Sequence, residues 1–146
     1  MPTRTARTAW TGGINDGSGR VELVSSGLAT YDVSFPHRTA DDADGSTSPE
    51  ELIAAAHSSC YAMALSGIIG RAGGTDIELD IRADVSIGPD PAGGLHLTGI
   101  ALTVRGRVEG LDAAAFEKAA AEAKAGCPVS KALTGVEITL DAALAG

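Results

Sequence analysis

Residues 48–71 form an apolar stretch with no polar face, and this stretch constrains the fold more than any other feature of the sequence. Ser48 is a favourable helix N-cap, Pro49 suits the first helical position, and Glu51 is placed to complete a capping box. Two consecutive glycines shortly after residue 71 predict the end of the helix. A helix in which only His57 and a few serines interrupt small and apolar residues belongs in a protein interior. We therefore expect a central helix around which the rest of the chain packs.

Patterns of alternating apolar and polar residues predict strands on both sides of this helix. Residues 76–87 and 95–108 alternate around a turn rich in glycine and proline, so we expect a half-buried antiparallel hairpin there. A polar, acidic loop at 39–48 precedes the long helix. The other expected elements are strands at 5–11, 19–25, 28–35 and 136–144 and helices at 112–124 and 127–133. This order predicts an α+β fold, and the length of 146 residues predicts one domain, residues 1–146.

Composition narrows the classes of function. The net charge of −8 and the lack of a basic cluster argue against nucleic acid as a partner. The N-terminus does not resemble a secretory leader, and no apolar stretch approaches the length of a membrane span. We therefore expect a cytoplasmic protein with no membrane partner.

Aromatic residues make up only 3% of the chain, so a core of small aliphatic side chains has limited apolar volume. This favours an obligate homodimer.

The chain contains two cysteines, Cys60 within the long helix and Cys127 at the start of the last one. A free cysteine inside a helix is most often a packing residue. Cys127, however, directly precedes Pro128 and is the expected N-cap, where unpaired backbone N–H groups favour a thiolate. In a reducing cytosol a permanent disulfide is not expected, whereas a catalytic one is compatible with the compartment. Together the two residues indicate a dithiol that cycles with a disulfide.

Two arginines are candidates for the cation that would stabilise a thiolate. Arg38 follows a strand end and Arg20 lies in an ordinary hairpin, so Arg38 is the better candidate. Glu50 is the acid most available to orient it, because Glu51 already has a capping role. Glu50 and Cys60 are ten residues apart, which corresponds to about 15 Å along one straight helix. Glu50 would therefore act near a cysteine of another subunit, across a twofold pairing of the central helices.

His57 precedes Cys60 by three residues, on about the same helical face. That spacing allows a Cys–His nucleophile of the hydrolase kind. A hydrogen-bonded core histidine is the alternative that we favour, because no third orienting group is evident. With two cysteines and three histidines at no ligand spacing, the sequence does not predict a structural zinc site.

The segments around both cysteines resemble a known family. Ser-Pro-Glu-Glu-Leu-Ile-Ala-Ala-Ala-His-Ser-Ser-Cys at 48–60 and Ala-Gly-Cys-Pro-Val-Ser at 125–130 closely resemble motifs of the OsmC/Ohr family of organic hydroperoxide reductases. The order of strands and helices matches over the whole chain, and the Ala-His that comes shortly before the first cysteine is most similar to the OsmC branch. The resemblance implies an OsmC/Ohr-like fold and an intertwined homodimer with two active sites at the subunit interface.

The resemblance also implies roles for the candidate residues. Cys60 falls on the peroxidatic cysteine of the family and Cys127 on the resolving cysteine, while Arg38 and Glu50 match its arginine and glutamate. It implies a thiol peroxidase without metal, haem or flavin, in which Cys60 becomes a sulfenic acid and then forms a disulfide with Cys127. An external dithiol, either a lipoyl protein or a small thiol, would restore both thiols. An apolar wall that includes Met63 would favour organic hydroperoxides, with hydrogen peroxide as a second substrate.

Two other functions would use the same residues. A redox sensor or binding module would use the dithiol without turnover, but no DNA-binding element is evident and the net charge argues against one. A Cys–His hydrolase or acyl transferase would need His57 and would tolerate the loss of Cys127.

Overall fold

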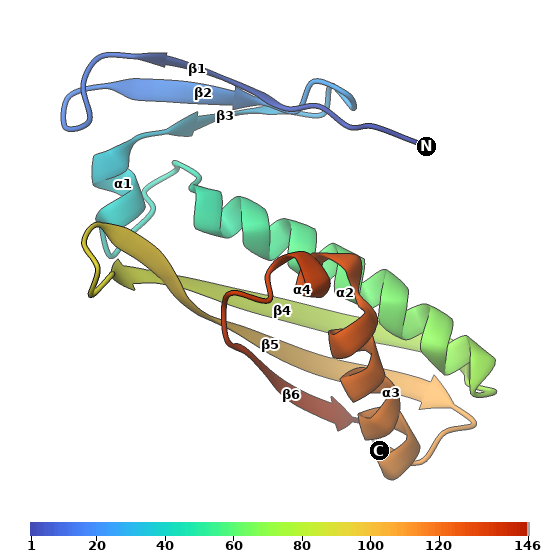
Figure 1. The fold of residues 1–146 in the computed structure, drawn as a ribbon. Helices are drawn as coiled ribbons and strands as arrows, with labels where there is room; N and C mark the ends of the chain where they lie inside the picture. The colour runs from blue at the N-terminus through green and yellow to red at the C-terminus, as the bar shows by residue number, and fades with distance from the viewer. Residues whose placement is uncertain (146) are drawn as a thin grey trace. The chain divides into compact units, whose positions relative to one another are not determined.

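The computed structural model describes residues 1–145 and shows an α+β fold (Figure 1), which confirms the predicted class. The chain consists of two compact units, Met1–Leu52 and the residues from Ile53 onward. In chain order the elements are β1 (Arg7–Thr11), β2 (Ser18–Glu22), β3 (Thr30–Val33), α1 (Phe35–Thr39), α2 (Pro49–Arg71), β4 (Thr75–Pro89), β5 (Leu95–Glu109), α3 (Ala113–Gly126), α4 (Pro128–Ala132) and β6 (Ile138–Leu144).

The first unit is a three-stranded antiparallel sheet in the order β1-β2-β3, followed by the short helix α1. The three strands were predicted, but α1 was not, because its residues were expected to end a strand and open a loop. Ser34 explains the difference. Its Oγ accepts a hydrogen bond from the His37 N–H at 3.3 Å, and Pro36 lies in the first turn, so local capping favours a helical turn over extended backbone.

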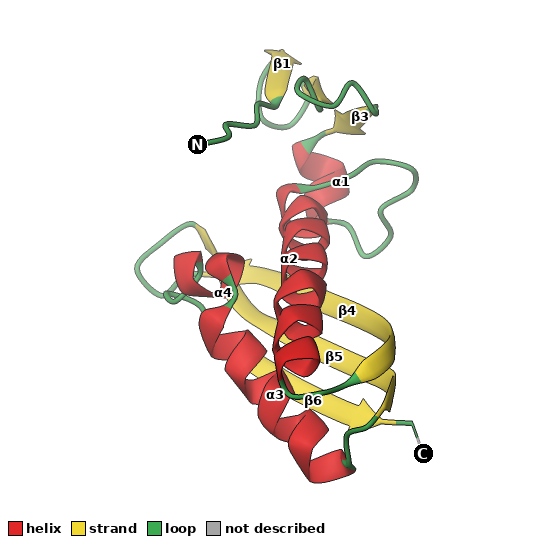
Figure 2. Cartoon of the chain, turned by 90° about the vertical axis from the view of Figure 1, so that its right-hand side faces the viewer, coloured by secondary structure: helices red, strands yellow, loops and turns green. Residues whose placement is uncertain are grey.

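The second unit is a sheet in the order β4-β5-β6 with helices on one face (Figure 2). Strands β4 and β5 form the long antiparallel hairpin that the alternation predicted. Strand β6 pairs with β5 in parallel, and α3 and α4 make the crossover between them. Helix α3 and the part of α2 from Ile53 lie side by side over the sheet (Figures 1 and 2).

Helix α2 begins as the sequence predicts, with one difference in its capping. The Ser48 Oγ accepts a hydrogen bond from the Glu51 N–H at 3.1 Å, as expected of an N-cap. The Glu51 carboxylate does not return to Ser48, however, but accepts a hydrogen bond from the Thr47 hydroxyl. The reciprocal half of the capping box is therefore replaced by a contact with the preceding residue.

The second unit buries only one stripe of α2. His57, Tyr61, Leu65 and Ile69, spaced four residues apart, are all 0% exposed, whereas Met63 is 75% exposed. The expectation of a helix surrounded on all sides is therefore wrong for a single chain. Apolar residues occur on every face of α2, but α3 and the sheet contact only one of these faces.

The expectation that no apolar stretch reaches the length of a membrane span is also wrong. Helix α2 has 23 residues and is long and apolar enough to cross a membrane, judged by length and composition alone. Its charges lie at the two ends, in Glu50, Glu51 and Arg71. Core helices of soluble proteins share these properties.

The core of the second unit is built from small and aliphatic side chains with two aromatic rings. Helix α2, strand β5 and helix α3 supply nearly all of it. Its fully or almost fully buried members are Tyr61, Leu65, Ile69, Ile100, Leu102, Val104, Phe116, Ala119, Ala120, Ala123 and Cys127.

Gly106 in β5 allows the Phe116 ring of α3 to lie against the sheet. An added β-carbon would be 2.6 Å from two ring atoms of Phe116, closer than van der Waals contact allows. We therefore expect Gly106→Ala to lower the free energy of unfolding by about 1–3 kcal/mol, measured by urea denaturation. Gly99→Ala on the same strand is the control, because its added β-carbon would be 3.9 Å from the nearest atom. Equal stability of the two variants would contradict this packing.

Candidate functional site

Cys60 and Cys127 come together in the second unit, although 67 residues separate them in the chain. Their sulfur atoms lie 3.2 Å apart, within hydrogen-bond range for sulfur, and both cysteines are free. A disulfide needs about 2.05 Å between the sulfur atoms, so a small side-chain movement would allow the bond. Cys127 is fully buried, whereas Cys60 is partly exposed. A reagent therefore reaches the pair through Cys60.

Regular secondary structure holds the backbone of both cysteines. Cys60 lies within α2, and the hydroxyl of its neighbour Tyr61 donates a hydrogen bond to the Ala120 carbonyl of α3 at 2.8 Å. Cys127 directly follows α3, and its N–H donates to the Ala123 carbonyl at 2.9 Å. It is also the N-cap of α4, as predicted, although its side chain makes no cap hydrogen bond. The contact between α2 and α3 therefore sets the distance between the two sulfur atoms.

The two thiols differ in acidity. Burial raises the pKa of Cys60; the Val129 backbone N–H opposes this, and the Cys127 sulfur adds to it. Burial also opposes charge on Cys127. The nearby backbone N–H groups of Ser130 and Val129, with the Cys60 thiol and the Ser130 hydroxyl, outweigh burial and lower the pKa of Cys127. The surroundings thus favour a thiolate at Cys127, while none of the groups that act on Cys60 within residues 53–145 is a cation.

His57 is a buried histidine whose Nε2 lies 2.7 Å from the Ser130 Oγ of α4. Burial lowers the pKa of His57, which keeps the ring neutral near pH 7. No hydrogen bond joins His57 to Cys60 in the part of the chain that the structure describes, so the geometry favours a core histidine over a Cys–His nucleophile. The sequence alone did not indicate a role for Ser130. Its hydroxyl three residues after Cys127 was the only signal that could have indicated one.

In the first unit, Arg38 at the end of α1 forms an ion pair with Glu50 in the first turn of α2. The Arg38 Nη2 lies 2.7 Å from one carboxylate oxygen, and its Nε donates to both oxygens at 3.1 and 3.2 Å. Glu50 is only 7% exposed, so the carboxylate holds the planar guanidinium in a defined orientation. Arg20, the other candidate, pairs with Asp32 at 3.2 Å on the surface, where both side chains are mostly exposed.

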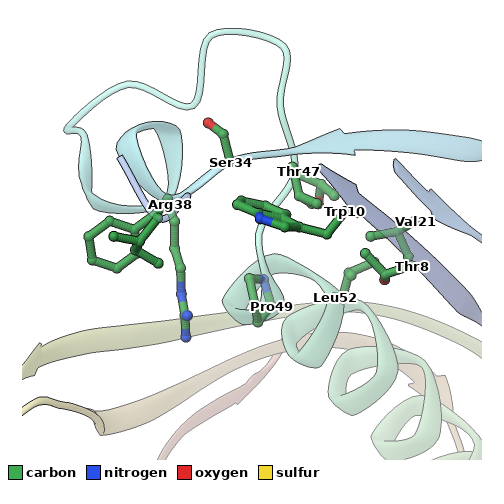
Figure 3. A pocket seen from close by; sticks show the side chains of 11 residues that line it. Thr8, Trp10, Val21, Ser34, Arg38, Thr47, Pro49 and Leu52 are labelled. Atoms are coloured by element: carbon green, nitrogen blue, oxygen red, sulfur yellow. The ribbon is translucent and has the colours of Figure 1, made fainter. Parts of the chain in front are cut away.

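A pocket of about 300 Å³ lies beside Arg38 within the first unit (Figure 3). Trp10, Pro49 and Leu52 contribute apolar surface to it, and Arg38 projects from α1. Met63, which was expected in an apolar wall, is not among the lining residues. The pocket therefore combines apolar surface with one guanidinium.

The other two histidines contact different kinds of partner. The His37 Nδ1 lies 2.7 Å from the Ser34 Oγ, and the His96 Nδ1 lies 3.2 Å from an Asp90 carboxylate oxygen. Over residues 1–145, no three His, Cys, Asp or Glu side chains are arranged to hold a metal ion.

Comparison with known proteins agrees with the resemblance seen in the sequence. The family described as OsmC-like protein matches residues 41–141. Peroxiredoxin OsmC of Escherichia coli (strain K12) is 44% identical over 132 residues, which cover 90% of each chain. Organic hydroperoxide resistance protein OhrA of Bacillus subtilis (strain 168) is 31% identical over 138 residues, or 93% of this chain and 95% of the relative.

A solved structure gives the same result for the fold. The crystal structure of an organic hydroperoxide resistance protein from Elizabethkingia anophelis matches with a TM-score of 0.75 at 27% identity, covering 99% of this chain and 98% of the other. Sequence and fold thus agree over nearly the full length of the chain. The chain belongs to the OsmC family and has the OsmC/Ohr fold.

Proposed function

We propose that this chain is a thiol-dependent peroxidase that reduces organic hydroperoxides to alcohols and also accepts hydrogen peroxide. The observation that carries the proposal is the 3.2 Å approach of two sulfur atoms from distant parts of the sequence. The names of the relatives, peroxiredoxin OsmC and organic hydroperoxide resistance protein, support it. A dithiol can carry out a two-electron reduction without a metal or another cofactor.

The reaction begins at Cys60, because it is the accessible sulfur of the pair. Its thiolate attacks the distal oxygen of the hydroperoxide, the O–O bond breaks, and the alkoxide leaves as an alcohol after taking up a proton. Cys60 is then a sulfenic acid. The Cys127 thiolate attacks this sulfur to form a disulfide and release water. An external dithiol, a lipoyl protein or a small thiol, restores both thiols by exchange.

Arg38 supplies the cation that Cys60 needs. Because burial raises the pKa of Cys60 within its own unit, a nearby guanidinium is required to favour the thiolate. Arg38 also offsets the charge that builds on the leaving oxygen, and Glu50 holds it in orientation. Ten residues of α2 separate Glu50 from Cys60, about 15 Å along the helix. We therefore assign the Arg38–Glu50 pair to Cys60 of the partner subunit, with the adjacent apolar pocket receiving the alkyl group.

This assignment requires an intertwined homodimer. The exposed side of α2, on which Met63 is 75% exposed, offers an apolar surface that a twofold partner would cover. Within the dimer, the two units of each chain act together as one domain. The cytoplasm is the compartment in which the reduced thiols would persist between turnovers.

Replacing each cysteine separately should have different effects. Cys60→Ser removes the attacking sulfur and should abolish hydroperoxide consumption. Cys127→Ser should consume a single equivalent per subunit and then stall at the sulfenic acid or overoxidise. Hydroperoxide loss in the presence of a dithiol, with mass spectrometry of the protein, measures both results. Wild-type turnover in both variants would contradict the proposal.

Replacing Arg38 should slow the oxidation of Cys60. Arg38→Met is expected to reduce the rate near neutral pH about a hundredfold, since it removes the cation that stabilises negative charge on both the thiolate and the leaving oxygen. Part of the rate should return as the pH rises, because loss of a cation raises the pKa of the thiol. Arg20→Met is the control, as its ion pair is exposed. Similar rates for the two variants in stopped-flow measurements would rule out the role of Arg38.

A charge placed on the exposed face of α2 should separate the subunits. Met63→Glu would leave a carboxylate buried in the proposed interface, so sedimentation velocity should show monomers and peroxidase activity should be lost. Ala114→Glu, on an exposed position of α3, is the control and should remain dimeric. A dimeric Met63→Glu protein would show that the interface lies elsewhere.

A further inference from the structure

His57 and Ser130 form a buried hydrogen bond beside the sulfur pair, and the proposed peroxidase cycle makes no use of it. The His57 Nε2 and the Ser130 Oγ are 2.7 Å apart, with His57 0% and Ser130 4% exposed. Ser130 lies three residues after Cys127, and its hydroxyl is one of the groups that stabilise negative charge on that sulfur. Ser130 is therefore hydrogen-bonded to the His57 ring and also contributes to the lowered pKa of Cys127.

Packing alone does not explain an imidazole at this position. The Nδ1 of His57 is buried and has no hydrogen-bond partner among residues 1–145, so the ring leaves one polar atom unpaired in the core. An unpaired buried polar atom lowers stability, and an apolar side chain of similar volume would avoid this loss. The polar ring thus points to a role for the nitrogen that does have a partner, Nε2.

The unpaired Nδ1 indicates which nitrogen carries the hydrogen. A neutral imidazole has one N–H donor and one acceptor nitrogen. With the hydrogen on Nε2, His57 donates to the Ser130 Oγ, and the Ser130 O–H remains free to donate to the Cys127 sulfur. With the hydrogen on Nδ1, that donor would be unpaired and Nε2 would draw the Ser130 hydrogen away from the sulfur. The first arrangement pairs the His57 donor, whereas the second leaves it unpaired.

We propose that His57 is a positioning residue that acts through Ser130, holding the serine O–H on the Cys127 sulfur so that Cys127 is ready to attack oxidised Cys60. This inference rests on the proposed function. In the step concerned, the S–S bond forms and the S–O bond of the Cys60 sulfenic acid breaks. Hydroxide leaves and takes up the proton that Cys127 had lost, giving water. The hydroperoxide has already oxidised Cys60, so no further oxidant is needed.

The test measures the acidity of Cys127 without any hydroperoxide. In a Cys60→Ser background Cys127 is the only thiol, so the β-carbon signal of isotope-labelled cysteine reports its ionisation by NMR. We expect Ser130→Ala and His57→Leu each to raise the pKa of Cys127 by about 1, because a hydrogen bond to the charged sulfur is lost. The two changes combined should raise it no further, since both break the same connection.

Conservative variants provide the matched controls. His57→Gln and Ser130→Thr keep a donor and a hydroxyl and should retain the acidity of Cys127. The other titratable groups against Cys127 are Cys60, absent from this background, and Tyr61, whose pKa burial raises far beyond the range of the titration. A folded His57→Leu protein, judged by circular dichroism, with unchanged Cys127 acidity would overturn the proposal.

A measurement on the unaltered chain keeps the proposal testable if the variants fail to fold. Nitrogen NMR of labelled histidine distinguishes the two neutral tautomers, and we expect hydrogen on Nε2 of His57. Hydrogen on Nδ1 would overturn the proposal. Neither experiment uses a hydroperoxide, so a failure of the peroxidase proposal, seen as absent hydroperoxide consumption, is distinct from a failure of this one.

Discussion

The packing of one face of α2 against α3 is the contact on which the rest of the second unit depends. The Tyr61 hydroxyl links the two helices by donating a hydrogen bond to the Ala120 carbonyl, and the small side chains of α3 allow the helices to approach closely. Cys60 is next to Tyr61 in α2, and Cys127 directly follows α3. The distance between the two sulfur atoms is therefore a property of helix packing rather than of a flexible loop.

Access and acidity are divided between the two sulfur atoms. The sulfur that a reagent can reach has a raised pKa, and the sulfur whose pKa is lowered is sealed in the core. Such a pair reacts with an oxidant only where a cation is brought to the accessible thiol. Under the proposed cross-subunit arrangement, the partner brings that cation, so reactivity would depend on assembly and an isolated chain would protect its own thiols.

Local signals in the sequence predicted local structure well. The Ser48 cap and the long alternation of β4 and β5 appear in the structure, and Cys127 caps α4. Nothing local predicted that β6 would pair with β5 in parallel, because a long crossover decides that pairing. An apolar helix surface likewise does not say whether the same chain or another covers it. At the candidate site, residue types predicted the Arg38–Glu50 contact, but acidity depends on burial, which spacing does not reveal.

The separation of 67 residues between the sulfur atoms has a mechanical consequence. A disulfide that closes a loop of that size lowers the conformational entropy of the unfolded chain. It can raise the free energy of unfolding by about 4 kcal/mol. The disulfide would also link the middle of α2 to the junction between α3 and α4. Reduced and oxidised protein would thus differ in rigidity as well as in redox state. Under the proposed cycle, resistance to heat and to proteases would be higher in the oxidised protein than in the reduced protein.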